Sequence, residues 1–299
     1  MAQRIILHFG TPKTGTTALQ RWLFRRRGRL ARQGLHYPRP LGYAPGGRWQ
    51  RATGAADARA KHQWMIGALM DADGRFVRRL DEMARKGPAD ARLTVLSTEG
   101  LYNRWWDFPA SGAEALREAS ARFDLEAWVW LREPVAFFRS VYVQKLRNPP
   151  SRDIASNGRD WSCEQMLDDD WFRRRLDYAG FLDDLARVVG AGRIRVFGYR
   201  GQTVADFLAA AGVAAERAPE PRENQTLGDD AVTQLRRLNA RDPPPSERPR
   251  LIASIVAADA RRKVAWRPFE LPPASEARVR ALTGPSLARL YETYGLDLR

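Results

Sequence analysis

An eight-residue segment near the N-terminus, GTPKTGTT from Gly10 to Thr17, contains residue types suited to holding an anion. Its glycines let the backbone approach the anion, its lysine adds positive charge and its threonines add hydroxyl donors. The segment follows an apolar run, RIILHF, and precedes apolar residues at helical spacing. A loop between a strand and a helix presents unpaired backbone N–H groups, and the helix dipole adds partial positive charge. We therefore predict an anion-binding loop; the alternative is an ordinary strand-to-helix turn.

The position of the lysine argues against ATP as the ligand. The ATP-binding pattern is G-x-x-x-x-G-K-[ST], and Thr16 stands where its lysine would be, whereas Lys13 lies earlier in the loop. None of the strands that we predict ends in the aspartate that helps to hold magnesium in those enzymes. The pattern thus disfavours a kinase or an ATPase.

A second anion-binding pattern lies in WLREPVAFFRSVY, where Arg132 ends an apolar run and Ser140 follows eight residues later. Pro134 can open a helix, which would place Ser140 about two turns along it and facing the strand end. A guanidinium fork with a hydroxyl suits a terminal phosphate. The alternatives are a surface ion pair for Arg132 and a helix-face hydroxyl for Ser140.

Both patterns resemble those of the sulfotransferases. The segment Pro12 to Thr17 matches their 5′-phosphosulfate loop, PKSGTT or PKTGTT, and Arg132 with Ser140 resembles their 3′-phosphate motif. The resemblance implies 3′-phosphoadenosine 5′-phosphosulfate (PAPS) as donor, adenosine 3′,5′-bisphosphate (PAP) as product, and sulfuryl transfer without a metal to a hydroxyl or, less readily, an amine. The residues it assigns to donor binding are Gly10, Thr11, Pro12, Lys13, Thr14, Gly15, Thr16, Thr17, Arg132, Ser140 and Tyr199.

The chain also departs from the family. Tyr199 follows an apolar strand as the adenine-side tyrosine of the family does, but Arg200 replaces the usual glutamate after it. Cytosolic members place an aromatic residue against the adenine where this chain has Ala18, and their C-terminal Arg-Lys-Gly clamp has no match. The residues that stack on the adenine and close over the 3′-phosphate are therefore unassigned.

Three residues are candidates for the chemistry itself. Lys13 can neutralise charge on the bridging oxygen as the nucleotide leaves. Glu99 follows the apolar run LTVL and ST, and resembles the glutamate of heparan-type sulfotransferases, which a Tyr-Phe pair follows as Tyr102 does here. A carboxylate is a weak base for a sugar hydroxyl, so the site must raise its pKa or bind the acceptor tightly. The other candidate base is His62, which resembles a histidine of some bacterial members. The alternative interpretation is that His62 only begins an amphipathic helix.

Alternating strands and helices must position these residues. Apolar runs predict strands at residues 4–9, 93–96, 127–131 and 194–197, with helical spacing after Thr16 and around 178–189. This order predicts an α/β, P-loop-like three-layer fold with a mostly parallel central sheet flanked by helices. We expect one domain over residues 1–299, an excursion or lid at 37–60, loops at 148–160 and 242–250, and a closing helix at 275–299. Polar residues after each strand would meet at one sheet edge.

Composition leaves other functions open. The net charge of +15 suits nucleic acid or another polyanion, but only five of the fifty basic residues are lysine, which indicates a general bias toward arginine. The rival functions are therefore a polyanion-binding protein and a nucleotide-binding protein without turnover. We expect no nucleic acid partner and a saccharide or small-molecule acceptor, favouring a carbohydrate or glycoconjugate. The tryptophans that could line its cleft are Trp49, Trp64, Trp105 and Trp106, and the alternative is that they are ordinary core residues.

The remaining features bear on the setting of the protein. Cys163 is the single cysteine, which excludes an intrachain disulfide, and we expect it to be a buried small side chain. The N-terminus lacks the apolar run of a signal peptide, and no apolar stretch approaches the length of a membrane span. We expect a cytoplasmic bacterial protein without a transmembrane segment.

Overall fold

The computed structural model describes residues 4–39, 60–71, 74–88, 90–152, 154–214, 226–262 and 266–299. The chain forms two compact units. The first contains Met1–Arg132 and Gly180–Glu223, and the second contains Glu133–Ala179 and Asn224–Arg299. The single domain over residues 1–299 stays a prediction. Of the predicted lid at 37–60, residues 40–59 lie outside the described residues.

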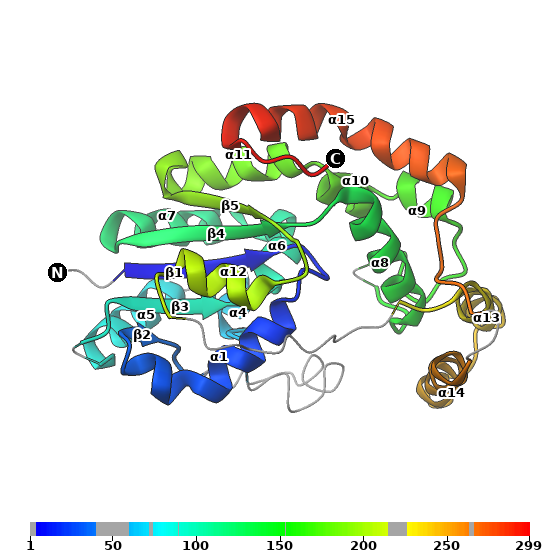
Figure 1. The fold of residues 1–299 in the computed structure, drawn as a ribbon, viewed down its shortest axis with the longest axis horizontal. Coiled ribbons are helices and arrows are strands. Elements are labelled where there is room, and N and C mark those ends of the chain that lie inside the picture. The colour runs from blue at the N-terminus through cyan, green and yellow to red at the C-terminus, as the bar shows by residue number, and fades with distance from the viewer. Residues whose placement is uncertain are drawn as a thin grey trace. The chain divides into compact units, whose positions relative to one another are not determined.

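The first unit contains a five-stranded parallel sheet with the order β2-β3-β1-β4-β5 (Figure 1). The strands are β1 (Arg4–Gly10), β2 (Leu35–His36), β3 (Leu93–Ser97), β4 (Leu125–Leu131) and β5 (Ile194–Gly198). Helices cover the sheet, which confirms the predicted α/β three-layer fold. All four predicted strands are present, each with one or two further residues. The short β2 was not predicted, because two residues are too few to show a period.

The register of the sheet decides which residues reach the same edge. His8 of β1 pairs with Ser97 of β3, and Gly10 pairs with Trp130 of β4. The carboxyl ends of parallel strands lie along one edge, where loops can bind ligands. The loop from Thr11, the turn at Glu99, and Arg132 and Tyr199 all follow such strand ends.

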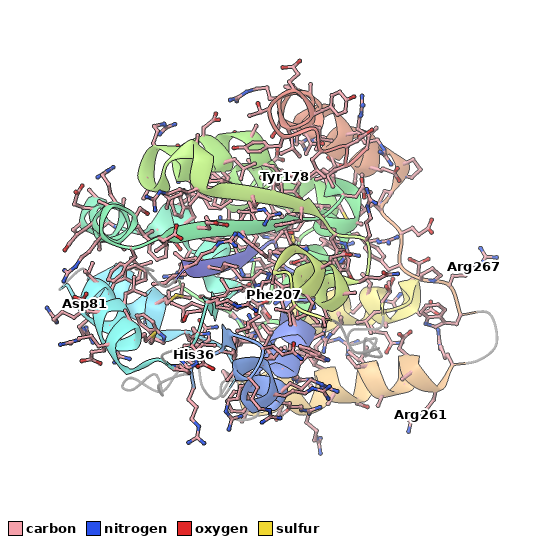
Figure 2. All side chains as sticks on the ribbon, turned by 60° about the vertical axis from the view of Figure 1, so that its left-hand side comes forward. His36, Asp81, Tyr178, Phe207, Arg261 and Arg267 are labelled. Carbon is pink, nitrogen blue, oxygen red and sulfur yellow. The ribbon has the colours of Figure 1, made fainter. Side chains whose placement is uncertain are left out.

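One face of the sheet packs against α1 (Thr16–Ala31) and α12 (Thr203–Ala210). Figure 1 shows α12 in front of the strands, and Phe207 of this helix, labelled in Figure 2, is fully buried. Trp128 and Trp130 alternate on β4 with buried neighbours that point to the opposite face of the sheet, so both tryptophans point to this face. The core of this layer therefore consists largely of aromatic and aliphatic side chains from the strands and these two helices.

Helices α4 (Trp64–Asp71), α5 (Arg75–Lys86), α6 (Gly100–Asn103), α7 (Ala110–Arg122) and α11 (Tyr178–Val189) also belong to this architecture, α11 from Gly180 onward in the first unit. Phe9 points to the face opposite to that of His8. Its ring lies 6.2 Å from Phe181 of α11 and 6.4 Å from Trp105, so these aromatics fill the second layer. Helices α4 and α5 both pack on α7.

The second unit is helical in its described part. It contains α8 (Pro134–Arg147), α9 (Cys163–Asp168), α10 (Asp170–Leu176), α13 (Asp229–Ala240), α14 (Arg248–Arg261) and α15 (Pro273–Tyr294). Pro134 opens α8 as predicted, and the Glu133 carboxylate caps the helix by accepting from the backbone N–H groups of Val135 and Ala136. Cys163 lies in the apolar core of this unit, as the sequence predicts.

The loop predicted at residues 242–250 extends further than the loop in the structure. Residues 242–250 were expected to be irregular because they contain several prolines, but α14 begins at Arg248 with Pro249 in its first turn. Proline is compatible with the first turn of a helix, where its missing N–H has no intrahelical partner to lose. In the parts of the chain described above, no helix has both the length and the apolar character needed to cross a membrane.

Candidate active site

The loop after β1 has an unusual backbone. Lys13 has a φ of 70° and Gly15 a φ of 72°, so two residues in left-handed conformation stand on either side of Thr14. Glycine adopts this conformation readily, whereas for lysine it is strained, and such strain tends to occur at functional sites. Turns of this kind direct successive N–H groups into one concavity that suits an anion.

The loop packs so tightly that its glycines cannot carry a side chain. A Cβ at Gly10 would lie 2.4 Å from Cγ2 of Thr16, and one at Gly15 would lie 2.7 Å from Oγ1 of Thr203. The Thr203 hydroxyl donates to the carbonyl of Thr14 over 2.6 Å. The N-terminal residue of α12 therefore clamps the loop, a contact that sequence reasoning missed.

The threonine hydroxyls of the loop have different partners. Thr14 donates to the carbonyl of Thr11 over 2.8 Å, which closes the loop on itself. Thr16 donates to Oε2 of Glu99 over 3.1 Å. The Thr17 hydroxyl has no hydrogen-bond partner in the described part of the chain, so it is the loop hydroxyl with a donor to spare. Thr11 and Pro12 are buried.

The N-terminus of α1 completes this concavity. Gly15 occupies the N-cap position without any side-chain hydrogen bond, and the first turn contains no acidic residue. The first N–H groups of a helix need acceptors from outside it, and an anion can supply them. An anion held by the loop would therefore also meet the start of α1.

The carboxylate of Glu99 lies between the loop and a lysine. Its Oε1 accepts from Nζ of Lys61 over 2.9 Å, while Oε2 receives the hydrogen bond from Thr16. The Lys61 side chain is 6% exposed and that of Glu99 28% exposed, so the lysine is shielded from water and the glutamate is only partly shielded. Each carboxylate oxygen has a second lone pair beyond its hydrogen bond with Thr16 or Lys61, and so Glu99 retains the capacity to accept a proton.

Neighbouring charges govern the protonation of Glu99. Burial acts to raise its pKa, but the ion pair and hydrogen bond with Lys61, the hydrogen bond from Thr16 and the charge of Lys13 outweigh it and lower the pKa. Of the two ways in which this weak base could serve, a raised pKa and tight binding of the acceptor, the structure does not provide the first. Glu99 is therefore fully ionised at neutral pH.

His62, the other candidate base, is fully buried and bonded on both sides of its ring. Its Nδ1 accepts from the backbone N–H of Ser97 over 3.1 Å, and Nε2 lies 3.1 Å from the carbonyl of Pro38, to which it must donate. Burial lowers the pKa of His62 to about 4. A base needs an accessible acceptor nitrogen, so this geometry favours Glu99.

A buried hydrogen-bond network connects the end of β3 to β1 and α1. Nδ1 of His8 lies 2.7 Å from Oγ of Ser97, and Gln20 of α1 donates to the same oxygen over 3.0 Å. Ser97 is thereby tied to β1 and α1 through its side chain and to His62 through its backbone. These contacts position the turn that carries Glu99.

Arg132 lies beside the loop, as predicted. Its Nη1 donates to the carbonyl of Lys13 over 3.0 Å, and its guanidinium lies 5.5 Å from the ring centre of Tyr199. The Tyr199 ring also borders the space above Gly15. Three of the predicted donor-binding elements therefore meet in the first unit. Ser140 is half-buried on α8 in the second unit, and its pairing with Arg132 stays a prediction.

The structure also adds a residue that sequence reasoning missed. Lys61 directly precedes His62 and belongs to none of the motifs described above. A signal was present in the composition, because lysine is rare in this arginine-rich chain. Two of the five lysines, Lys13 and Lys61, both act on Glu99.

The tryptophans that could line the acceptor cleft differ in how deeply they are buried. Trp64 and Trp105 are 3% and 9% exposed and belong to the core. Trp106 is half-buried, with its ring 5.6 Å from that of Tyr102, and Trp49 lies outside the described residues. In the described ranges, no group of three or more His, Cys, Asp or Glu side chains is placed to hold a metal ion.

Comparison with known proteins gives one informative result. A scan against protein-family models found no match, and neither did a search of curated proteins. Among solved structures, the fold is similar to that of a sulfotransferase from Alicyclobacillus acidocaldarius, with a TM-score of 0.52 and 15% sequence identity. The similarity covers 99% of this chain and 98% of that one. At this identity, the likeness shows that the chain has the same fold.

Proposed function

We propose that this protein is a sulfotransferase that moves the sulfuryl group of PAPS to a hydroxyl, less readily an amine, of a carbohydrate or glycoconjugate. The observation that carries the proposal is the hydrogen bond from Thr16 to Glu99. It links a candidate base to the position where an ATP-binding loop has its lysine. The fold shared with a solved sulfotransferase supports the same conclusion.

The loop fits the 5′-phosphosulfate of the donor. The left-handed backbone at Lys13 and Gly15, the uncapped start of α1 and the Thr17 hydroxyl all offer donors to an anion. Arg132, with Ser140, would hold the 3′-phosphate, and Tyr199 would lie on the adenine side. When bound, PAPS supplies an activated sulfuryl group and a nucleotide leaving group, and the proposed transfer is in-line and needs no metal.

We assign separate roles to the charged side chains. Glu99, whose side chain is partly exposed, takes the proton of the acceptor hydroxyl. Lys61 keeps that carboxylate ionised and oriented through their 2.9 Å contact. Lys13 stabilises negative charge that develops on the bridging oxygen. Because the pKa of Glu99 is lowered, tight binding and alignment of the acceptor must compensate for a weak base.

Nucleotide binding tests the donor assignment. PAP at about 100 times its dissociation constant should stabilise the fold by roughly 2.7 kcal/mol, and ATP at the same concentration much less, both without magnesium. Equal shifts in melting temperature for the two nucleotides, or a need for magnesium, would exclude this donor. A polyanion-binding protein would instead show affinity that falls steeply with salt and hardly depends on Lys13.

Replacement of the base tests turnover. Glu99→Gln should lower donor-dependent sulfation by roughly 10² to 10⁴-fold, the usual contribution of a general base. The shift in melting temperature with PAP should remain, because the donor is held by other residues. A nucleotide-binding protein without turnover would show the PAP shift but no activity for Glu99→Gln to remove.

A further inference from the structure

Two carbonyl groups of the predicted anion-binding loop accept hydrogen bonds from side chains that are distant in the sequence. The Lys13 carbonyl accepts from Nη1 of Arg132 over 3.0 Å, and the Thr14 carbonyl accepts from Oγ1 of Thr203 over 2.6 Å. The donors lie 119 and 189 positions away along the chain, yet all four residues belong to the first unit. Two consecutive peptide groups of the loop are therefore held from outside it.

These two bonds fix the direction of the N–H groups that follow. In a trans peptide unit, the carbonyl of one residue and the N–H of the next residue point in opposite directions. Because the Lys13 carbonyl is directed at Arg132, the N–H of Thr14 faces the other way. Because the Thr14 carbonyl is directed at Thr203, the same holds for the N–H of Gly15. Within the residues that the structure describes, neither N–H donates a hydrogen bond, so both are available to an anion.

The backbone at Lys13 needs such support. Lys13 has a φ of 70°, and a left-handed conformation at a residue other than glycine persists only where the surrounding structure enforces it. The bond from Arg132 supplies part of that enforcement. A peptide group that turned over would present its carbonyl oxygen to the anion in place of its N–H, and an anion is repelled by a carbonyl oxygen. The outside donors thus decide whether the loop attracts an anion.

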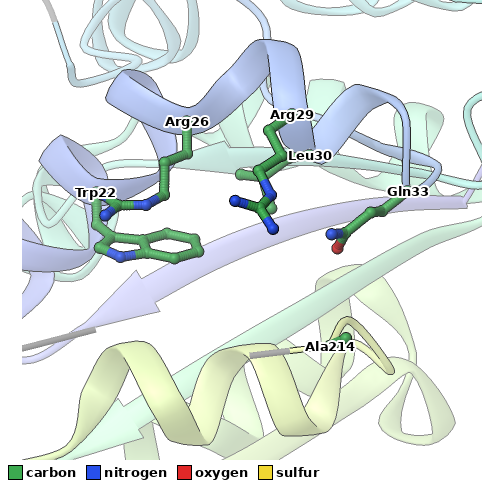
Figure 3. A pocket seen from close by; sticks show the side chains of 6 residues that line it. All are labelled: Trp22, Arg26, Arg29, Leu30, Gln33 and Ala214. Atoms are coloured by element: carbon green, nitrogen blue, oxygen red, sulfur yellow. The ribbon is translucent and has the colours of Figure 1, made fainter. Parts of the chain in front are cut away.

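Helix α12, which begins at Thr203, is held firmly against α1. Phe207 of α12 packs in one apolar cluster with Leu19 of α1. Farther along, the hollow lined by Trp22 of α1 and by Ala214, in the turn after α12, has room for about one water molecule (Figure 3). This close packing fixes where α12 begins, so the Thr203 hydroxyl reaches the loop from a rigid support.

We propose that Arg132 and Thr203 are positioning residues that hold the loop with its N–H groups turned toward the anion. The proposal rests on the proposed function in taking that anion to be the 5′ end of the nucleotide. A guanidinium has five N–H donors, so Arg132 can hold the Lys13 carbonyl and the 3′-phosphate together. Binding of the 3′-phosphate then also steadies the loop that holds the 5′ end, and Arg132 links the two ends of the nucleotide.

Isothermal titration calorimetry with PAP and with adenosine 5′-monophosphate (AMP) tests the role of Thr203. AMP is PAP without its 3′-phosphate, so it reports on the loop alone. Thr203→Val keeps the shape of the side chain and removes the donor, and it should weaken both nucleotides by the same factor, about three- to tenfold. Thr203→Ser keeps the hydroxyl and should restore most of the affinity. Unchanged affinity in Thr203→Val would overturn this role.

Arg132→Met distinguishes a double role of the arginine from a single one. If Arg132 touched only the 3′-phosphate, its replacement would leave the affinity for AMP unchanged. We expect AMP to bind about three- to tenfold more weakly, because the loop loses a donor, and PAP to lose more, because the 3′-phosphate also loses its partner. An AMP affinity equal to that of the wild type would refute the link between the two ends.

Two control variants remove comparable hydrogen bonds elsewhere. Thr283→Val removes a hydroxyl that donates to the carbonyl of Val279 over 2.9 Å within α15. Arg193→Met removes a guanidinium that donates to the carbonyl of Phe123 over 3.0 Å, just before β5 begins and so at the opposite edge of the sheet. Both should change either affinity less than twofold. Losses as large as those in the loop variants would mean that general destabilisation or loss of charge lowers the affinity, and would overturn the proposal.

Amide NMR with inorganic sulfate separates this proposal from the assignment of the donor. Sulfate carries no adenosine, so its binding depends on the loop and not on recognition of a nucleotide. Sulfate should move the amide signals of Thr14 and Gly15 in the wild type, and move them less in Thr203→Val. No movement with sulfate, PAP or AMP would overturn the proposal. If these signals move but the wild type binds PAP no more tightly than AMP, the donor assignment fails and the positioning role stands.

Discussion

The Thr16 hydroxyl donates a hydrogen bond to Oε2 of Glu99 over 3.1 Å, across 83 positions of sequence. This contact joins the first turn of α1 to the end of β3, because β1 and β3 are neighbours in the parallel sheet. An ATP-binding loop would place a lysine at this position, directed at the phosphates. Here the threonine turns to a carboxylate, and the positive charge comes from Lys13 and Lys61.

Lys13 combines a strained backbone with a charged side chain, and two substitutions can separate them. Lys13→Gly should raise the free energy of unfolding by about 1 kcal/mol, because glycine adopts a φ of 70° without strain. Lys13→Ala keeps the strain and should leave stability nearly unchanged. Both should lower sulfation by roughly 10² to 10³-fold. Denaturant unfolding and donor-dependent kinetics check these outcomes; equal stability of the two variants would show that the backbone here is relaxed.

Lys61 should set the acid limb of the pH profile. Lys61→Met removes a positive charge 2.9 Å from Glu99, so the pKa of Glu99 should rise. A base works only when deprotonated, and the acid limb of kcat/KM should therefore move to higher pH, by about 1 to 2 units.

Lys61→Arg serves as the matched control, because it retains the charge and should shift the limb much less. An acid limb that does not move in Lys61→Met would show that Glu99 is not the titrating base. The melting temperature of each variant, measured in parallel, shows whether loss of the buried lysine has altered the fold.

The contact between Gly15 and Thr203 can be tested by a double-mutant cycle. Gly15→Ala should lower stability by at least 1 kcal/mol, because it combines a φ of 72° with a Cβ only 2.7 Å from Oγ1 of Thr203. Thr203→Ala removes that oxygen together with its hydrogen bond to Thr14. In the double variant, the loss should be smaller than the sum of the two single losses, and strict additivity would place Thr203 away from the loop.

The buried histidines should make the protein sensitive to mild acid. His62 titrates near 6.5 in the unfolded chain, while burial lowers its pKa to about 4 in the fold, so the unfolded state binds more protons between these values. The contribution of His62 to the free energy of unfolding is fully present above pH 6.5. It should fall by roughly 3 kcal/mol as the pH drops to about 4.

Denaturant unfolding at several pH values measures this loss. In His62→Gln the decline between pH 6.5 and 4 should be shallower, although not absent, because burial also lowers the pKa of His8, to about 3. A variant as acid-sensitive as the wild type would mean that His62 is accessible to protons in the folded protein. It would then regain its place as a candidate base.

Local patterns in the sequence determined much of the scaffold. The apolar runs at residues 4–9, 93–96, 127–131 and 194–197 predicted four of the five strands, and the helix at 178–189 has the predicted limits. These elements are predictable because burial of a strand or helix face imposes its period on neighbouring residues. Glycine and lysine in the loop likewise predict an anion site, and that site stays a prediction.

The tertiary structure alone decided which side chains meet there. Lys61 reaches Glu99 from 38 positions away, and Thr203 reaches the loop from 189 positions away, and no local period encodes such pairs. The same holds for His62, which the sequence offers as a candidate base, whereas the fold bonds both of its ring nitrogens to backbone groups. Strand register brings these residues together, so the sequence predicted an anion-binding loop, and the fold decided which carboxylate lies beside it.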